Sequence, residues 1–116
     1  MELTINEKAV KLILGIKQLR VLDKTFGMEV KGVKFGFGAG VSQVVQGAKN
    51  ENPVVLFDFI KSTSNVALGD IELENWLFEQ DIEALSKKVL DFLATSKATK
   101  TAYKKAQAQD EQSDNE

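Results

Sequence analysis

A helix that is apolar almost all round is the feature that most constrains this chain. Asn52 and Pro53 mark its start, because an asparagine side chain caps free N–H groups and proline suits the first helical position. In the run that follows, Val54-Val55-Leu56-Phe57-Asp58-Phe59-Ile60-Lys61, only Asp58 and Lys61 are charged. Such a helix is normally buried on several sides. In a chain of 116 residues it is either the central core helix or partly an interface element.

The N-terminal half contains both strand and helix periodicity. Residues 2–14 alternate as a β-hairpin does, with a turn expected at Asn6-Glu7-Lys8. Residues 16–26 have helical spacing, whereas the glycine-rich residues 28–40 predict a short strand or extended loop. A short helix is expected next. The apolar positions expected on the inner faces of these two helices are Ile16, Leu19, Leu22, Phe26, Val41, Val44, Val45 and Ala48.

The C-terminal half is predicted to be helical. A short helix is expected over residues 71–78, and Asp81 caps an amphipathic helix over 82–93. Residues 97–106 favour a helix with only a thin line of alanines, and the acidic residues 110–116 are expected to be disordered. We therefore predict an α+β fold, with an N-terminal β-hairpin packed against a bundle of about five helices. The predicted domain spans residues 1–95, followed by a helix-prone segment and acidic tail at 96–116.

The chain contains no histidine and no cysteine. This composition excludes structural zinc sites with those ligands, histidine-based triads and thiol chemistry. The run Gly36-Phe37-Gly38-Ala39-Gly40 precedes a helix, but its third glycine comes one residue too early for a dinucleotide-binding fingerprint. The acidic group is typical of solvated helix faces and first turns; it comprises Glu72, Glu74, Glu79, Asp81 and Glu83. We expect no catalytic, cofactor or metal site, and a protein that is not an enzyme.

The charge pattern and hydropathy give expectations about partners and location. The net charge is −2, and the face formed by Lys17, Arg20 and Lys24 is the only support for a small regulator that binds nucleic acid. Strongly salt-dependent DNA binding would test that alternative. The N-terminus has no basic region followed by a long apolar one, and no apolar run reaches the ~20 residues of a membrane span. We expect a cytoplasmic protein that binds neither nucleic acid nor membranes.

The aromatic residues are expected to lie mostly in the core, since a small domain needs them there. Phe35 and Phe37 are exceptions, because glycines flank them and little local structure shelters them. For this pair both a core and an interface position stay open; a fold that survives their joint replacement by serine, with loss of partner binding, would indicate an interface. The candidate protein-binding residues are Phe35, Phe37, Val54, Val55, Phe57 and Trp76.

The order of these pieces resembles a known family. An "LTIN" hairpin leads into "GIKQLRVLDKTFG", "VKGVKFGFGAGVSQVV", "NPVVLFDFIKS" and "LENWLFEQDIEALSKKVLDFL", and then a Lys-rich tail with an acidic end. Over about residues 2–105 the chain is similar to the tail assembly chaperones of long-tailed phages and prophages of Gram-positive bacteria. It departs from them at Asn6-Glu7-Lys8, where a tighter turn of the Asn-Gly type is expected.

The resemblance implies a protein that binds the tape measure protein and keeps it soluble. It also implies a longer form of the chain, made by ribosomal frameshifting, which recruits tail tube subunits. The tube subunits then displace the chaperone, so that it is absent from the mature virion. Self-association of the chain stays open, and Lys104-Lys105 is a candidate position for a slippery codon pair. The alternative is a structural tail component (tube, terminator or connector protein) that is retained in the virion.

Overall fold

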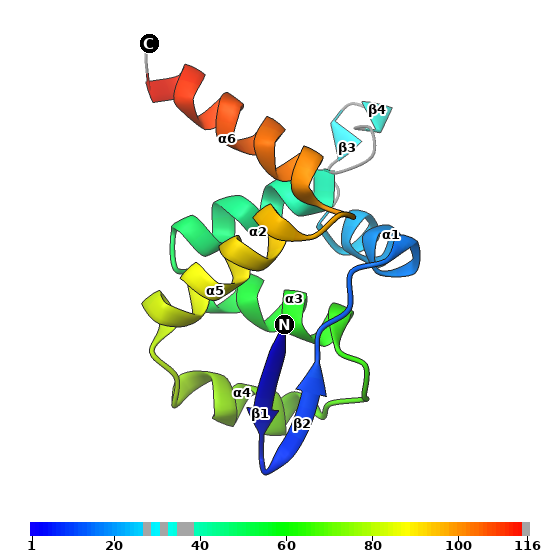
Figure 1. Ribbon diagram of the computed structural model, residues 1–116, viewed down its shortest axis with the longest axis vertical. Coiled ribbons are helices and arrows are strands. Elements are labelled where there is room, and N and C mark those ends of the chain that lie inside the picture. Colours follow the sequence, from blue (N-terminus) through cyan, green and yellow to red (C-terminus); the bar gives the residue numbers. More distant parts are fainter. Residues whose placement is uncertain (27–28, 31–32, 35–38, 115–116) are drawn as a thin grey trace.

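The structure, a computed structural model, describes residues 1–26, 29–30, 33–34 and 39–114, and the side chains of residues 1–26 and 40–108. It confirms the α+β prediction. The described part holds an N-terminal antiparallel sheet, a second short strand pair and six helices (Figure 1). In chain order the elements are β1 Glu2–Ile5, β2 Lys8–Lys11, α1 Ile16–Phe26, β3 Glu29–Val30, β4 Val33–Lys34, α2 Ala39–Lys49, α3 Pro53–Thr63, α4 Asp70–Phe78, α5 Ile82–Thr95 and α6 Lys100–Asp114.

The N-terminal hairpin is shorter and tighter than predicted. Ile5 pairs with Lys8, so the turn contains only Asn6 and Glu7, with φ angles of 51° and 68°. Positive φ at both positions is the requirement of a type I′ turn, whose twist matches that of the flanking strands. The prediction that Lys8 belongs to the turn is wrong, because Lys8 pairs with Ile5 as the first residue of β2. The tight turn forms here without a glycine.

The loop after α3 extends the pairing of β2. The amide of Ile13 donates to the carbonyl of Thr63 at 2.8 Å, and the amide of Asn65 donates to the carbonyl of Lys11 at 2.9 Å. In return, the amide of Lys11 donates to Oδ1 of Asn65 at 3.0 Å. These bonds fix the hairpin to the end of α3, while one face of the sheet enters the core. The buried side chains on that face are Leu3, Ile5 and Val10.

Helices α1 and α2 pack closely together. All four apolar positions predicted for α2 are buried, whereas Ile16 at the start of α1 is 60% exposed and lies outside the core, contrary to the prediction. A side chain at Gly40 would collide with the backbone of Leu22, and the Gly40 amide donates to Oδ1 of Asp23 at 2.9 Å. The last glycine of the glycine-rich run is therefore explained by the contact of α2 with α1.

Helix α3 packs against α1, α2 and α4, and its side chains Leu56, Phe59 and Ile60 are fully buried. Oδ1 of Asn52 accepts a hydrogen bond from the amide of Val54 at 3.0 Å, which confirms the predicted cap. On its inner side, Phe59 is fully buried and meets Phe92 of α5 in an edge-on contact, with ring centres 6.5 Å apart. Asp81 caps α5 as predicted, through the amide of Ala84 at 3.1 Å. Both helices extend beyond their predicted last residues.

Helix α6 packs against α2 and α5 at the end of the molecule opposite the N-terminal hairpin (Figure 1). Ala106 is buried, and the Thr99 hydroxyl donates to the carbonyl of Leu93 at 2.7 Å, which fixes the start of the helix. The helical backbone continues to Asp114, into the acidic segment that the sequence predicts to be disordered, because extending an anchored helix costs little. The predicted domain boundary after residue 95 stays a prediction.

Candidate protein-binding groove

An open groove lies between α3 and α4. Its volume is about 300 Å³. The first turn of α3 and the last turn of α4 line the same groove, and Lys61 near the end of α3 pairs with Asp70 at the start of α4, so the two helices run antiparallel. The lining residues are Pro53, Val54, Phe57, Asp70, Glu74, Leu77 and Phe78.

The groove presents large apolar side chains to solvent. Val54 and Phe78 are each 66% exposed, although both are bulky and apolar. Ile71 is 74% exposed and lies seven residues before Phe78, which places it on the same face of α4. Scattered apolar residues on a surface need no explanation, but apolar residues gathered at a concave site mark a place for a ligand or partner.

Helix α4 is apolar on two sides, and this explains the exposure. Leu73, Trp76 and Leu77 are buried in the core. Ile71 and Phe78 fall on another side of the same helix and cannot reach the core at the same time. Leu77 contacts both regions, since it is buried and also lines the groove.

The rim of the groove carries negative charge. Asp70 forms an ion pair with Lys61, whose ammonium group lies 5.9 Å from the ring centre of Phe57. Glu74, one helical turn further along α4, has neither an ion pair nor a side-chain hydrogen bond within the described residues. The lining therefore combines an apolar floor with a free carboxylate, which suits a ligand that is apolar and basic.

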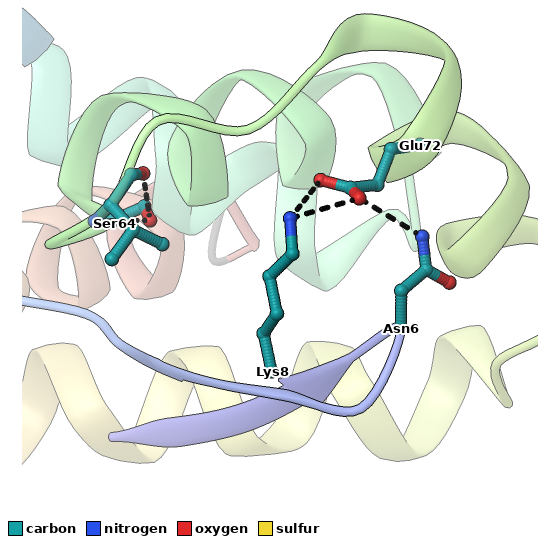
Figure 2. A network of polar contacts seen from close by, with 5 residues as sticks. Asn6, Lys8, Ser64 and Glu72 are labelled. Atoms are coloured by element: carbon teal, nitrogen blue, oxygen red, sulfur yellow. Dashed lines mark hydrogen bonds and ion pairs between the residues drawn. The ribbon is translucent and has the colours of Figure 1, made fainter.

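A polar cluster holds α4 against the N-terminal hairpin. Glu72 accepts hydrogen bonds from Nδ2 of Asn6 at 3.1 Å and from Nζ of Lys8 at 3.2 Å (Figure 2). The bond from Asn6, and then that from Lys8, lowers the pKa of the Glu72 carboxyl below its ordinary value of 4.5. Because Asn6 lies in the tight turn and Lys8 is the first residue of β2 after it, the hairpin end helps to position the first turn of α4.

The comparison with protein families decides what kind of protein carries this groove. Residues 2–107 match the family described as phage tail assembly chaperone protein, TAC. The chain belongs to the phage tail assembly chaperone family. Neither the search of curated proteins nor that of solved structures returned a significant match. Family membership implies that the partners of this chaperone are tail proteins, which makes an exposed apolar groove its candidate binding site.

The structure brings together only some of the residues predicted to bind the chaperone's partners. Val54 and Phe57 line the groove. Val55 faces α2, because a side chain at Gly47 would come within 2.5 Å of its Cγ1 atom. Trp76 is 8% exposed and lies in the core. For Phe35 and Phe37 the binding role stays a prediction, since both residues lie outside the described part of the chain.

Sequence reasoning missed the α4 side of the groove. The sequence predicts Phe78 in the core with most of the aromatic residues, but it is one of the most exposed apolar side chains described. Its spacing of seven residues from Ile71 was the available signal, because Leu73, Trp76 and Leu77 already form a separate apolar face. The sequence predicts ordinary solvated surface for Glu74, and only its place in the groove lining with Phe57 and Leu77 distinguishes it.

The described residues offer little for other kinds of site. Among them, no three histidine, cysteine, aspartate or glutamate side chains gather closely enough to hold a metal ion. No helix in the described part is both long and apolar enough to cross a membrane. The groove between α3 and α4 is therefore the candidate binding site within the described residues.

Proposed function

We propose that this chaperone is a non-catalytic protein that binds the tape measure protein in the host cytoplasm and keeps it soluble during tail assembly. Membership of the tail assembly chaperone family supports a role with tail proteins. The observation that carries the finer proposal is the α3–α4 groove, where Val54 and Phe78 are each 66% exposed. A chaperone that keeps an aggregation-prone protein, its client, in solution needs exposed apolar surface with which to bind that protein.

The size of the groove fits reversible binding. Burying a side chain such as valine or phenylalanine completely contributes about 1.5–3 kcal/mol. Association also costs several kcal/mol in lost freedom of the two partners, on the order of 4 to 15 kcal/mol. A few such contacts give weak binding per copy, which several copies along one client would strengthen. Weak individual contacts suit a chaperone that must later leave its client.

The proposal includes the later steps of assembly. In the order that the family resemblance implies, a longer frameshifted form of the chain recruits tail tube subunits. Those subunits then replace the chaperone on the tape measure protein, and the finished particle lacks it. A slippery heptamer in the gene near the codons of Lys104 and Lys105 is expected, and its absence from the 3′ region of the gene would remove the frameshifted partner from the proposal.

Co-expression tests the central step. The tape measure protein is produced alone, with the wild-type chaperone, or with the Val54→Ser/Phe78→Ser double variant, and its soluble fraction is measured. We expect the wild type to keep it soluble and the double variant to fail. Ile16→Ser is the matched control, since Ile16 is also 60% exposed but lies on α1 and does not line the groove.

Mass spectrometry of purified particles separates the proposal from its alternative. A chaperone is expected to be missing from mature virions. Its recovery at a fixed number of copies per particle would instead show a structural tail component and would overturn the proposed role.

A further inference from the structure

The groove has a charge pattern that its apolar floor does not require. Asp70 and Glu74 both belong to the lining, and the nearby cation Lys61 is already paired with Asp70. The carboxylate of Glu74 thus stands beside exposed apolar surface with no partner among the described residues. A bound segment that buries this surface would also partly desolvate that charge, which is unfavourable unless the segment supplies a cation.

We propose that the groove accepts a single amphipathic helix of the client, with lysine or arginine beside its apolar face. This inference rests on the proposed function, because it names the chemistry of the segment that the chaperone holds. It commits to a segment of another protein, and a second copy of this chain is treated below as an outcome that would overturn it.

A helix fits the walls of the groove better than a strand does. Both walls are helices, whose N–H and C=O groups are already bonded along their own axes, so they offer no free edge to an added strand. Val54 and Phe57 are three residues apart on α3, and on α4 Leu77 and Phe78 follow Glu74 at spacings of three and four. Such rows form the ridges between which a third helix packs.

The basic flank follows from the position of Glu74. This residue lines the groove one helical turn before Leu77 and Phe78 on α4, so a helix seated on those two side chains passes beside its carboxylate. A lysine or arginine at the border of the bound apolar face would meet the carboxylate, whereas a glutamate there would be repelled. Complementary charge of this kind selects among apolar helices more than it adds affinity.

Binding of synthetic helices to the full-length chaperone tests the inference. The probes are two fluorescent peptides of about 18 residues, long enough to form a helix on a surface. Both carry the same leucine and alanine face, flanked by lysines in one and by glutamates in the other. At low salt we expect the lysine peptide to bind about three- to tenfold more tightly, with the difference shrinking at high salt.

Charge reversal in the groove provides the decisive comparison. Glu74→Lys should abolish or invert the preference between the two peptides. Asp91→Lys, the same change of charge at an exposed position of α5, should leave the preference unchanged. Equal binding of both peptides by the wild type, or an equal response of the two variants, would overturn the inference about charge.

The outcomes also separate this inference from the proposed function. If neither peptide binds while solubility of the tape measure protein still depends on Val54 and Phe78, the helix inference is wrong and the proposed function stands. If sedimentation shows a dimer that Val54→Ser/Phe78→Ser converts to monomer, and peptides do not bind, a second copy occupies the groove. That result would likewise overturn the inference.

Discussion

Two helix pairs of this chaperone differ in whether another helix covers their apolar surface. The pair α2 and α5 is covered by α6, and Ala106 in that cover is only 1% exposed. The pair α3 and α4 keeps an open side in the described part of the chain, where Val54 and Phe78 are each 66% exposed. The same chain thus covers one apolar surface with its own C-terminal helix and leaves another to solvent.

The comparison shows that apolar content alone does not distinguish stability from binding. Helix α6 covers its pair with Ala102, Tyr103 and Ala106, which pack in or against the core. In the groove, bulky side chains point outward and nothing described lies over them. We therefore expect substitutions under α6 to change the free energy of unfolding, and substitutions in the groove to change partner binding.

The largest effect is expected at Phe59, whose contact with Phe92 joins α3 to α5. Phe59→Ala should lower the free energy of unfolding by about 3–5 kcal/mol, since it removes a fully buried ring and leaves a cavity. Chemical denaturation measures the loss. Phe57→Ala is the comparison on the groove side of the same helix, and an equal loss there would show that the groove is core.

The next largest effect on stability is expected for α6, which covers the pair α2 and α5. Ala106→Glu should destabilise the protein by about 1–3 kcal/mol, because the new side chain has no room and its charge would be buried against α2 and α5. Ala108→Glu places the same residue at an exposed position of α6 and should change stability little. Similar unfolding curves for the two variants would mean that α6 does not cover the pair.

Substitutions in the groove should affect stability less. Val54→Ser and Phe78→Ser are each expected to cost under about 1 kcal/mol of unfolding free energy, because both side chains are mostly solvated already. Leu77→Ser, next to Phe78 but only 2% exposed, should cost several times more. Thermal unfolding of the three variants checks the order, and a large loss from Phe78→Ser would contradict an open groove.

The smallest effect is a pH dependence at the polar cluster of Asn6, Lys8 and Glu72. The folded protein lowers the pKa of Glu72, so its contribution to stability is present above the ordinary pKa of 4.5 and is lost as the pH falls below it. Glu72→Gln should lower the melting temperature slightly at pH 7 and by less at acid pH. Glu83→Gln on α5 is the control, and an identical pH profile for both variants would argue against the cluster.

Much of the fold could be predicted from local patterns. The cap at Asn52, the cap at Asp81 and the inner face of α2 follow from short-range sequence signals. The tight turn at Asn6 and Glu7 could not, because it forms without glycine and is supported by Glu72, a residue distant in the chain. The coverage of α2 and α5 by a thin alanine line likewise depends on packing that local sequence does not encode.

Only half of the candidate site was within reach of the sequence. The sequence of α3 is too apolar for a solvated helix, so Val54 and Phe57 could be predicted as binding residues. Val55 has the same composition signal, but the approach of α2 at Gly47 turns it inward. The contribution of α4 depends on its antiparallel placement beside α3, which is a tertiary fact.

The most direct test is to map where the tape measure protein contacts this chaperone. Backbone amide signals of the isotope-labelled chain are followed by NMR while the tape measure protein, or a helical fragment of it, is added. We predict that the shifts concentrate at residues 53–57 and 70–78 and leave α6 unchanged. Shifts confined to α6, or to α1 around Ile16, with none at the groove, would contradict the division between a covered and a binding surface.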